Sequence, residues 1–114
     1  MTQRVALVGH GVVGSRIERS VPVLLPGVEL VGVDTRHPAR AVAALAHVDA
    51  AILASTGPHA GLARELIERQ MPVISIGDEL DDVAAMLELD QMALDADVPL
   101  VVGAGMSPGL SGLL

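Results

Sequence analysis

The sequence predicts an α/β protein with an open, doubly wound, parallel sheet of about five strands. Five short apolar runs recur along the chain without apolar–polar alternation, as is typical of parallel strands that helices cover on both faces. Amphipathic helix patterns lie between these runs and give the order βαβαβαβαβ. Crossover connections of this kind are almost always right-handed, so the alternating order leads to one parallel sheet.

The strands are expected at the apolar runs of residues 4–8, 29–33, 50–53, 73–76 and 100–102. The first helix is expected from Gly11 to the residue before Pro22, because proline cannot continue a helix and disfavours the helical conformation in the residue before it. Two further helices are expected at residues 38–46 and 58–70, each with a proline in its favoured first turn.

A fourth helix is expected at about residues 80–96. Helical spacing predicts which apolar side chains of the last two helices face the sheet. These are Leu62, Ala63, Leu66 and Ile67 in the helix at 58–70, and Leu80, Val83, Ala84, Leu87 and Leu94 in the fourth helix.

The composition narrows the possible functions. A chain of 114 residues supports one domain, and a hydrophobic content of 51% is enough for a core. The chain has no Phe, Tyr or Trp, which excludes recognition of nucleic-acid bases by aromatic stacking. It has no Cys, which excludes disulfides, thiolate catalysis and thiolate metal sites. Neither a metal-ligand spacing nor a Ser/His/Asp spacing is present, so no metal is expected.

The net charge of −7 is concentrated in one segment. Residues 78–97 hold eight acids and no base, whereas the rest of the chain holds six acids and seven arginines. We interpret these acids as a solvated helix face, with a specific acidic docking surface as the alternative. Nucleic acid is not an expected partner. No apolar run reaches membrane-spanning length and no signal-peptide pattern is present, so we expect a cytoplasmic protein without membrane attachment.

The stretch VALVGHGVVGSRI, residues 5–17, places three glycines at GxGxxG spacing directly behind the first expected strand. A helix pattern follows, and an acid, Asp34, closes the second strand 20 positions after Gly14. Gly9 would permit the tight turn, Gly11 would leave room for a pyrophosphate, and Gly14 would let helix and strand pack closely. This context predicts a Rossmann-like dinucleotide-binding loop with the phosphates at the helix N-terminus, and the alternative is a glycine turn without a ligand. The expected contacts are Gly9, His10, Gly11, Val12, Val13 and Gly14.

The residues after the second strand bear on the choice of cofactor. Asp34 would accept hydrogen bonds from free ribose hydroxyls, which suits NAD, whereas Arg36 would attract the 2′-phosphate of NADP. With Asp34, Thr35 and Arg36 all expected at the site, NAD is modestly favoured. Arg36 could equally stack on the adenine or be a surface residue.

Small residues also follow the other strands. Ligands of doubly wound sheets bind beyond the carboxyl ends of the strands, so Ser55, Thr56, Gly77 and Gly103 are expected beside the nicotinamide half. Ordinary turn formation and helix capping explain these positions equally well. His10 and His59 could face a dinucleotide, but no histidine has an acid partner at a defined spacing, and the catalytic residues stay unknown.

The C-terminal part of the chain, residues 65–114, resembles the latter part of the NAD(P)-binding domain of saccharopine dehydrogenase-like oxidoreductases. The resemblance rests on VISIGDE, residues 73–79, and on GAGMSPG, residues 103–109. With the glycine loop and Asp34 it covers nearly the whole chain. The family usually has Asp where this chain has Ser107, which puts any substrate-related role of that acid in doubt.

The resemblance implies an NAD(P)-dependent oxidoreductase that acts on the carbon–nitrogen bond of an amino-acid-derived substrate. It also implies a second domain that binds substrate and dimerises, so homodimerisation is a candidate property of the longer protein. We therefore expect this chain to be the N-terminal cofactor domain of a longer enzyme, with little or no turnover alone. The alternative function is a non-catalytic NAD(H)-sensing module, which would not need GAGMSPG.

Overall fold

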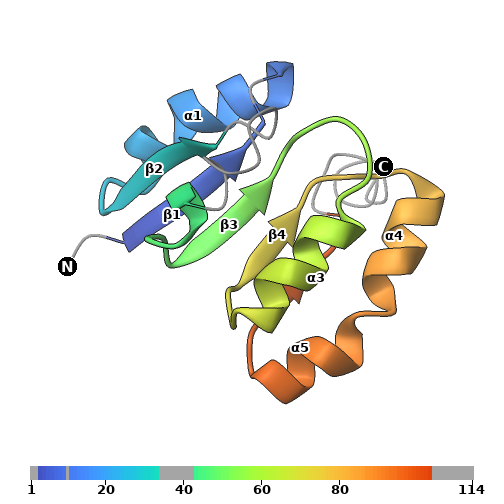
Figure 1. Cartoon of the computed structure of the whole chain (residues 1–114). Helices are drawn as coiled ribbons and strands as arrows, with labels where there is room; N and C mark the ends of the chain where they lie inside the picture. The colour runs from blue at the N-terminus through green and yellow to red at the C-terminus, as the bar shows by residue number, and fades with distance from the viewer. Residues whose placement is uncertain (1–2, 10, 34–42, 104–114) are drawn as a thin grey trace. The chain divides into compact units, whose positions relative to one another are not determined.

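The structure is a computed structural model that describes residues 3–9, 11–33 and 43–103 (Figure 1). Its five strands belong to one sheet in the order β2-β1-β3-β4-β5, and the chain is a Rossmann-like α/β protein, as the sequence predicts. The chain divides into two units, Met1–Thr56 and Gly57–Leu114, which are described in turn.

The first unit has three parallel strands with β1 in the middle. These are β1 (Gln3–Val8), β2 (Val28–Val33) and β3 (Ala50–Leu53). Val8 at the end of β1 pairs with Val33 of β2 and with Leu53 of β3, so the three strands end level with one another. All three side chains are buried. The carboxyl ends of these strands therefore form one continuous edge.

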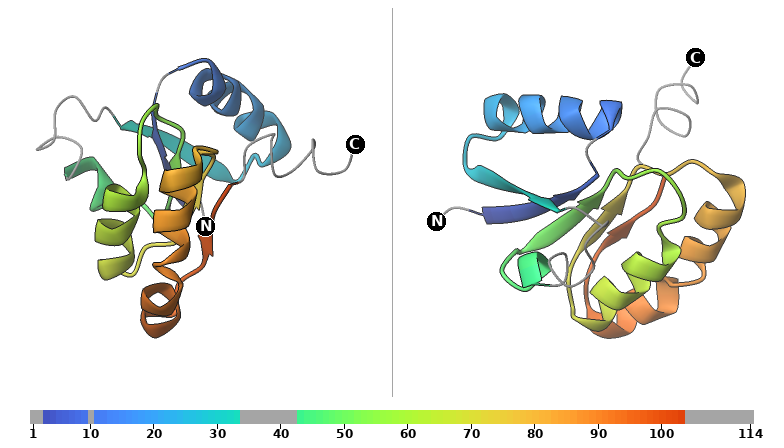
Figure 2. Two further views of the ribbon diagram at one scale, coloured as in Figure 1. Left: turned by 90° about the vertical axis from the view of Figure 1, so that its right-hand side faces the viewer. Right: turned by 45° about the horizontal axis from the view of Figure 1, so that its top comes forward.

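Helix α1 (Val12–Leu24) packs against β1 and β2, as the views in Figure 2 show. The expected end before Pro22 was wrong, because α1 continues for two residues beyond this proline. A proline lacks only its own N–H, and the backbone after it can still close the last turn. Here the N–H of Leu25 donates to the carbonyl of Val21 at 2.7 Å. Of the helix expected at 38–46, residues 38–42 lie outside the described part, and residues 43–45 are helical.

The second unit contains α3 (Ala60–Glu68), β4 (Val73–Ser75), α4 (Leu80–Leu87), α5 (Asp90–Ala96) and β5 (Leu100–Val101). Strand β4 pairs in parallel with β5. The expected inner face of α3 is confirmed, since Ala63, Leu66 and Ile67 are buried and Leu62 is half-buried.

The expected fourth helix was wrong in two respects. It is divided into α4 and α5 at residues 88–89, and most of its expected inner face lies outside. Leu80, Leu87 and Leu94 are 81%, 60% and 65% exposed, Ala84 is also exposed, and Val83 is half-buried. The buried residues are instead Asp82, Met86 and Ala93. Helix α4 places Asp82 on its inner face because the Asp82 carboxylate accepts hydrogen bonds from the N–H groups at the start of α3.

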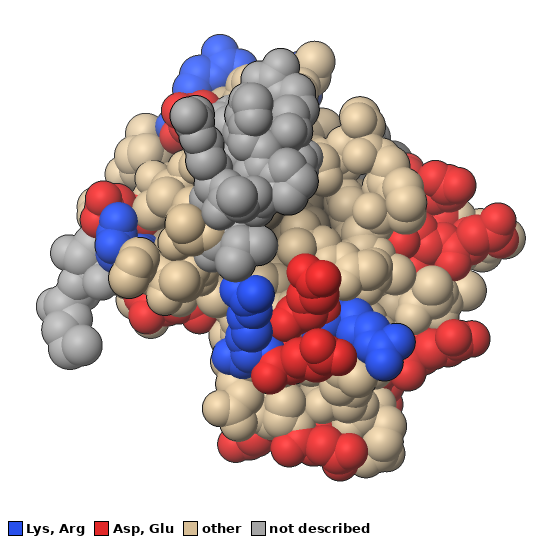
Figure 3. Space-filling view, in the orientation of Figure 1, with Lys and Arg blue, Asp and Glu red and all other residues tan. Residues whose placement is uncertain are grey.

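The acids of residues 78–97 gather over α4 and α5 in Figure 3. Most are exposed, as expected of a solvated face, and the buried Asp82 is the exception. Among the described residues, no helix has the length and apolar character needed to cross a membrane.

Candidate functional site

The first glycine of the loop is required by the fold of the first unit. Gly9 has a φ of +113°, a conformation that side chains with a Cβ rarely adopt. A Cβ at this position would also lie 2.5 Å from the backbone nitrogen of Ser55 and 2.8 Å from the carbonyl carbon of Ala54. The end of β1 thus lies directly against the chain that leaves β3. The expected tight turn at Gly9 is confirmed.

The third glycine is also required by packing. Gly14 is the buried residue of α1, and a Cβ there would collide with the carbonyl oxygen of Gly9. The helix therefore approaches the end of β1 as closely as its backbone allows. The packing role expected for Gly14 is confirmed.

Gly11 differs from both neighbours in the motif. Its φ of −72° is accessible to any residue, and a Cβ on it would meet no atom within 4 Å. Neither backbone conformation nor packing within the described residues therefore requires a glycine here. Among the described residues, the space in front of Gly11 is open, as a ligand that approaches the backbone would need.

The N-terminus of α1 begins at this open position. Gly11 is its N-cap, no side-chain hydrogen bond caps it, and its first turn has no acid. The first helical bond runs from the Ser15 N–H to the Gly11 carbonyl at 2.9 Å, which leaves the N–H groups before it without helical partners. Val12 and Val13 beside them are 72% and 49% exposed. Uncompensated N–H groups and the helix dipole favour an anion at this end.

Carboxylates occupy the corresponding ends of α3 and α4. The N–H of His59, the N-cap of α3, donates to both oxygens of Asp82 at 2.9 Å, and the N–H of Ala60 donates to Oδ1 at 3.0 Å. The first turn of α4 contains Asp81 and Asp82. Among the described helices of eight or more residues, α1 is thus the one whose start carries no carboxylate.

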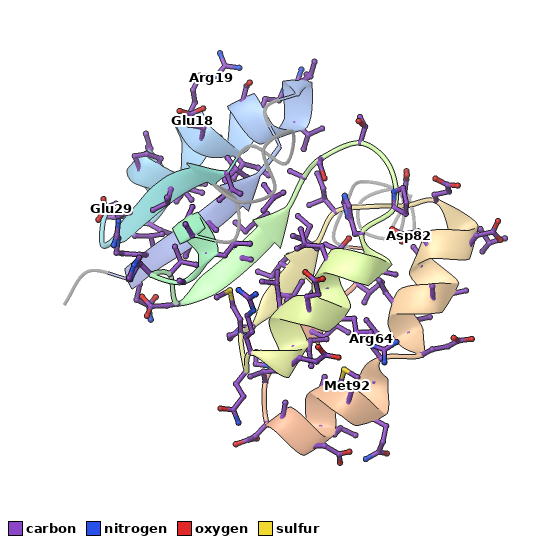
Figure 4. The ribbon with its side chains drawn as sticks, in the orientation of Figure 1. Glu18, Arg19, Glu29, Arg64, Asp82 and Met92 are labelled. Carbon is purple, nitrogen blue, oxygen red and sulfur yellow. The ribbon has the colours of Figure 1, made fainter. Side chains whose placement is uncertain are left out.

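The second unit contains a buried polar network around Asp82, which Figure 4 shows at the start of α4 beside α3. His59, Ser75 and Asp82 are 2%, 0% and 5% exposed. The His59 Nδ1 lies 2.7 Å from the Ser75 Oγ, and the N–H of Gly77 donates to the same hydroxyl at 3.2 Å. No local pattern in the sequence indicates this network, because its members lie 16 and 23 positions from His59.

The network also explains Gly77. A Cβ at this position would lie 3.1 Å from the His59 Nδ1 and 3.4 Å from the Asp82 Oδ2. The missing side chain at Gly77 therefore has a reason within the second unit itself.

Some of the other expected contacts lie in the described part of the chain, and the rest lie outside it. Ser55 is half-buried at the end of β3 and lies beside Gly9, while Thr56 is exposed. Gly103 follows β5 with a φ of +67°. His10, Asp34, Thr35 and Arg36 lie outside the described residues, as do Ser107 and most of GAGMSPG. In the described part of the chain, no three His, Asp or Glu side chains come together as a metal site would need.

No protein-family model matches the chain, and no curated protein sequence does. Solved structures do match it. A Gfo/Idh/MocA family oxidoreductase from Vibrio cholerae matches with a TM-score of 0.66 at 21% identity, over 90% of this chain and 38% of the other. GenD2 from gentamicin A biosynthesis, solved in complex with NAD, matches with a TM-score of 0.64 at 20% identity, over 88% and 34%.

An oxidoreductase from Sinorhizobium meliloti matches with a TM-score of 0.60 at 18% identity, over 88% of this chain and 36% of the other. At these identities the matches show a shared fold. The chain spans little more than a third of the length of each of these proteins.

Proposed function

We propose that this chain is the dinucleotide-binding domain of an NAD(P)-dependent oxidoreductase, with the pyrophosphate at the N-terminus of α1. The observation that carries the proposal is the open space at Gly11. Folding accounts for Gly9 and Gly14, so a ligand is the remaining reason for glycine at the middle position of the motif.

The distribution of charged side chains also supports a pyrophosphate at the N-terminus of α1. A pyrophosphate would be repelled by the carboxylates at the starts of α3 and α4, whereas the first turn of α1 carries no acid. In this site Gly9, His10, Gly11, Val12, Val13 and Gly14 surround the phosphates. The exposed valines give the ligand an apolar surface beside the polar N–H groups.

The remaining contacts follow from the chemistry of the cofactor. Asp34 accepts hydrogen bonds from the adenosine ribose, with Thr35 and Arg36 beside it, and this arrangement favours NAD over NADP. GenD2, which shares the fold, was solved with NAD. Ser55, Thr56, Gly77 and Gly103 lie after β3, β4 and β5, and we assign them to the nicotinamide half.

The fold matches support the proposed class of enzyme. The matching proteins include oxidoreductases, one of them of the Gfo/Idh/MocA family, which favours an oxidoreductase of that type. The saccharopine dehydrogenase-like assignment, with its amino-acid-derived substrate, rests mainly on two sequence motifs, VISIGDE at residues 73–79 and GAGMSPG at residues 103–109, and of the second the structure describes only Gly103. Because the chain spans 34–38% of the matching proteins, we infer that it is the cofactor domain of a longer, cytoplasmic enzyme with substrate-binding and dimerising parts elsewhere.

The experiment is calorimetric titration of the chain and its Gly11→Ala variant with NADH and, separately, NADPH. A methyl group at residue 11 would separate the pyrophosphate from the backbone N–H groups, so we expect NADH affinity to fall at least about tenfold, the loss of one charge-assisted hydrogen bond. Tighter binding of NADPH than NADH would show that Arg36 outweighs Asp34.

The matched control is Gly61→Ala, an exposed glycine of α3 whose Cβ would also meet no atom within 4 Å. It should leave both affinities unchanged. Failure of the unmodified chain to bind either dinucleotide would refute the proposal. If Gly11→Ala binds NADH as tightly as the unmodified chain does, the pyrophosphate does not lie at the N-terminus of α1.

A further inference from the structure

Two backbone segments of the second unit are joined by its buried polar network. One is residues 57–59, which follow β3 in the chain, and the other is residues 75–77 at the end of β4. The His59 ring and the Ser75 hydroxyl connect them at 2.7 Å. Segment 57–59 begins four residues after β3 ends at Leu53, and segment 75–77 begins with the last residue of β4. Ligands of open α/β sheets bind beyond the carboxyl ends of such strands.

The hydroxyl of Ser75 has a specific role in this connection. It accepts a hydrogen bond from the Gly77 N–H at 3.2 Å. It also forms a hydrogen bond with the His59 Nδ1 at 2.7 Å, as donor or acceptor according to the imidazole tautomer. Ser75 thereby fixes the histidine ring and the turn after β4 with one group. A Cβ at Gly77 would lie 3.1 Å from that ring, so the turn rests directly on the imidazole.

Asp82 fixes the other end of the network. Its two oxygens accept from the N–H groups of His59 and Ala60 and so tie α4 to the start of α3. Buried polar groups are costly unless all are paired, and a fully paired network specifies one geometry. No buried side-chain nitrogen or oxygen lacks a partner in the described residues.

We propose that His59, Ser75 and Asp82 are positioning residues that hold segments 57–59 and 75–77 in the conformation that receives the nicotinamide half of the dinucleotide. The inference rests on the proposed function. Hydride transfer needs the ring held within a fraction of an ångström, and loops need buried support to achieve this. None of the three side chains contacts the cofactor itself, since all are buried.

The test compares two ligands that differ in the nicotinamide. NADH contains it, whereas ADP-ribose carries the same adenosine and pyrophosphate without it. Ser75→Ala removes the hydroxyl with little change in volume. We expect this variant to bind NADH about three- to tenfold more weakly, the effect of one hydrogen bond, and to bind ADP-ribose as the unmodified chain does.

Ser20→Ala, at an exposed serine of α1, is the matched control and should bind both ligands normally. Equal weakening of both ligands by Ser75→Ala would overturn the inference, because the network would then support the fold in general. Unchanged binding of both would overturn it as well. If the unmodified chain binds neither ligand, the proposed function itself fails, which is a distinguishable result.

A second measurement covers the case in which Ser75→Ala does not fold. In the unmodified chain, NADH should shift the amide resonances of Gly77 and His59, and ADP-ribose should leave them in place. Identical shifts with both ligands, or none with either at saturation, would contradict the inference.

Discussion

The three glycines of the loop meet three different physical demands. Gly9 adopts a positive φ and touches the backbone of Ser55, Gly14 touches the carbonyl of Gly9, and Gly11 faces open space. We propose that one sequence motif thus combines two requirements of folding with one of ligand approach. Substitution should separate them, because a methyl group affects stability at one position and binding at another.

Gly14→Ala should destabilise the chain by about 1–3 kcal/mol, the usual cost of forcing an extra methyl into a close contact. The helix would have to move away from the Gly9 carbonyl. Gly11→Ala should change the free energy of unfolding by less than about 1 kcal/mol, since glycine and alanine differ modestly at an N-cap. Urea unfolding followed by circular dichroism measures both. Equal stability losses at the two positions would contradict the separation.

At the scale of the element, α4 shows how a long-range bond overrides an apolar pattern. Leu80, Ala84 and Leu87 have helical spacing, and the sequence alone indicates that they face the sheet. In the structure the opposite side, with Asp82 and Met86, is buried. The Asp82 carboxylate satisfies the free N–H groups at the start of α3, and this bond fixes the rotation of α4 about its axis.

This orientation makes a prediction for two adjacent residues. Met86→Ala should cost about 2–5 kcal/mol of stability, because Met86 is fully buried and its removal leaves a cavity. Leu87→Ala, at a position 60% exposed, should cost no more than about 0.5 kcal/mol. Thermal or urea unfolding of the two variants gives the comparison. A larger loss of stability for Leu87→Ala than for Met86→Ala would indicate that the face of α4 expected from the sequence is the buried one.

The strands could be predicted from the sequence to within one residue at each end, because short apolar runs, most of them beside a Gly or Pro, define them locally. The glycine loop was also found, since its motif is local. The Asp82 bonds were not predictable, because no pattern links residues 59 and 82. The end of α1 was misjudged because a proline in a last turn removes a single donor and does not stop the helix.

At the scale of the whole molecule, the described units differ in what they offer a dinucleotide. The first unit has a helix start without a side-chain cap, where we propose the anion site, and the second has two segments near strand ends that are joined by buried polar groups. The acids of α4 and α5 belong to the second unit. We expect moderate salt to weaken binding of the anionic cofactor by screening its phosphate contacts.

Binding and turnover should separate in this chain. Hydride transfer requires a substrate carbon held against the nicotinamide, and this positioning contributes a large part of the rate. The chain spans only 34–38% of the matching proteins, and we have placed the substrate-binding part outside it. We expect the 114-residue chain to bind NADH and to reduce NAD at a negligible rate with any amino-acid-derived substrate.

The fluorescence of NADH reports binding directly, because the chain has no Trp or Tyr to contribute emission. The absorbance of NADH in the same solutions reports turnover when NAD and a panel of amino-acid-derived substrates are supplied. Sustained reduction of NAD by the isolated chain would show that it holds a complete active site and would overturn its assignment as a cofactor domain. Binding without turnover that persists in a longer protein would instead favour an NAD(H)-sensing module, because an oxidoreductase regains activity once its substrate-binding part is present.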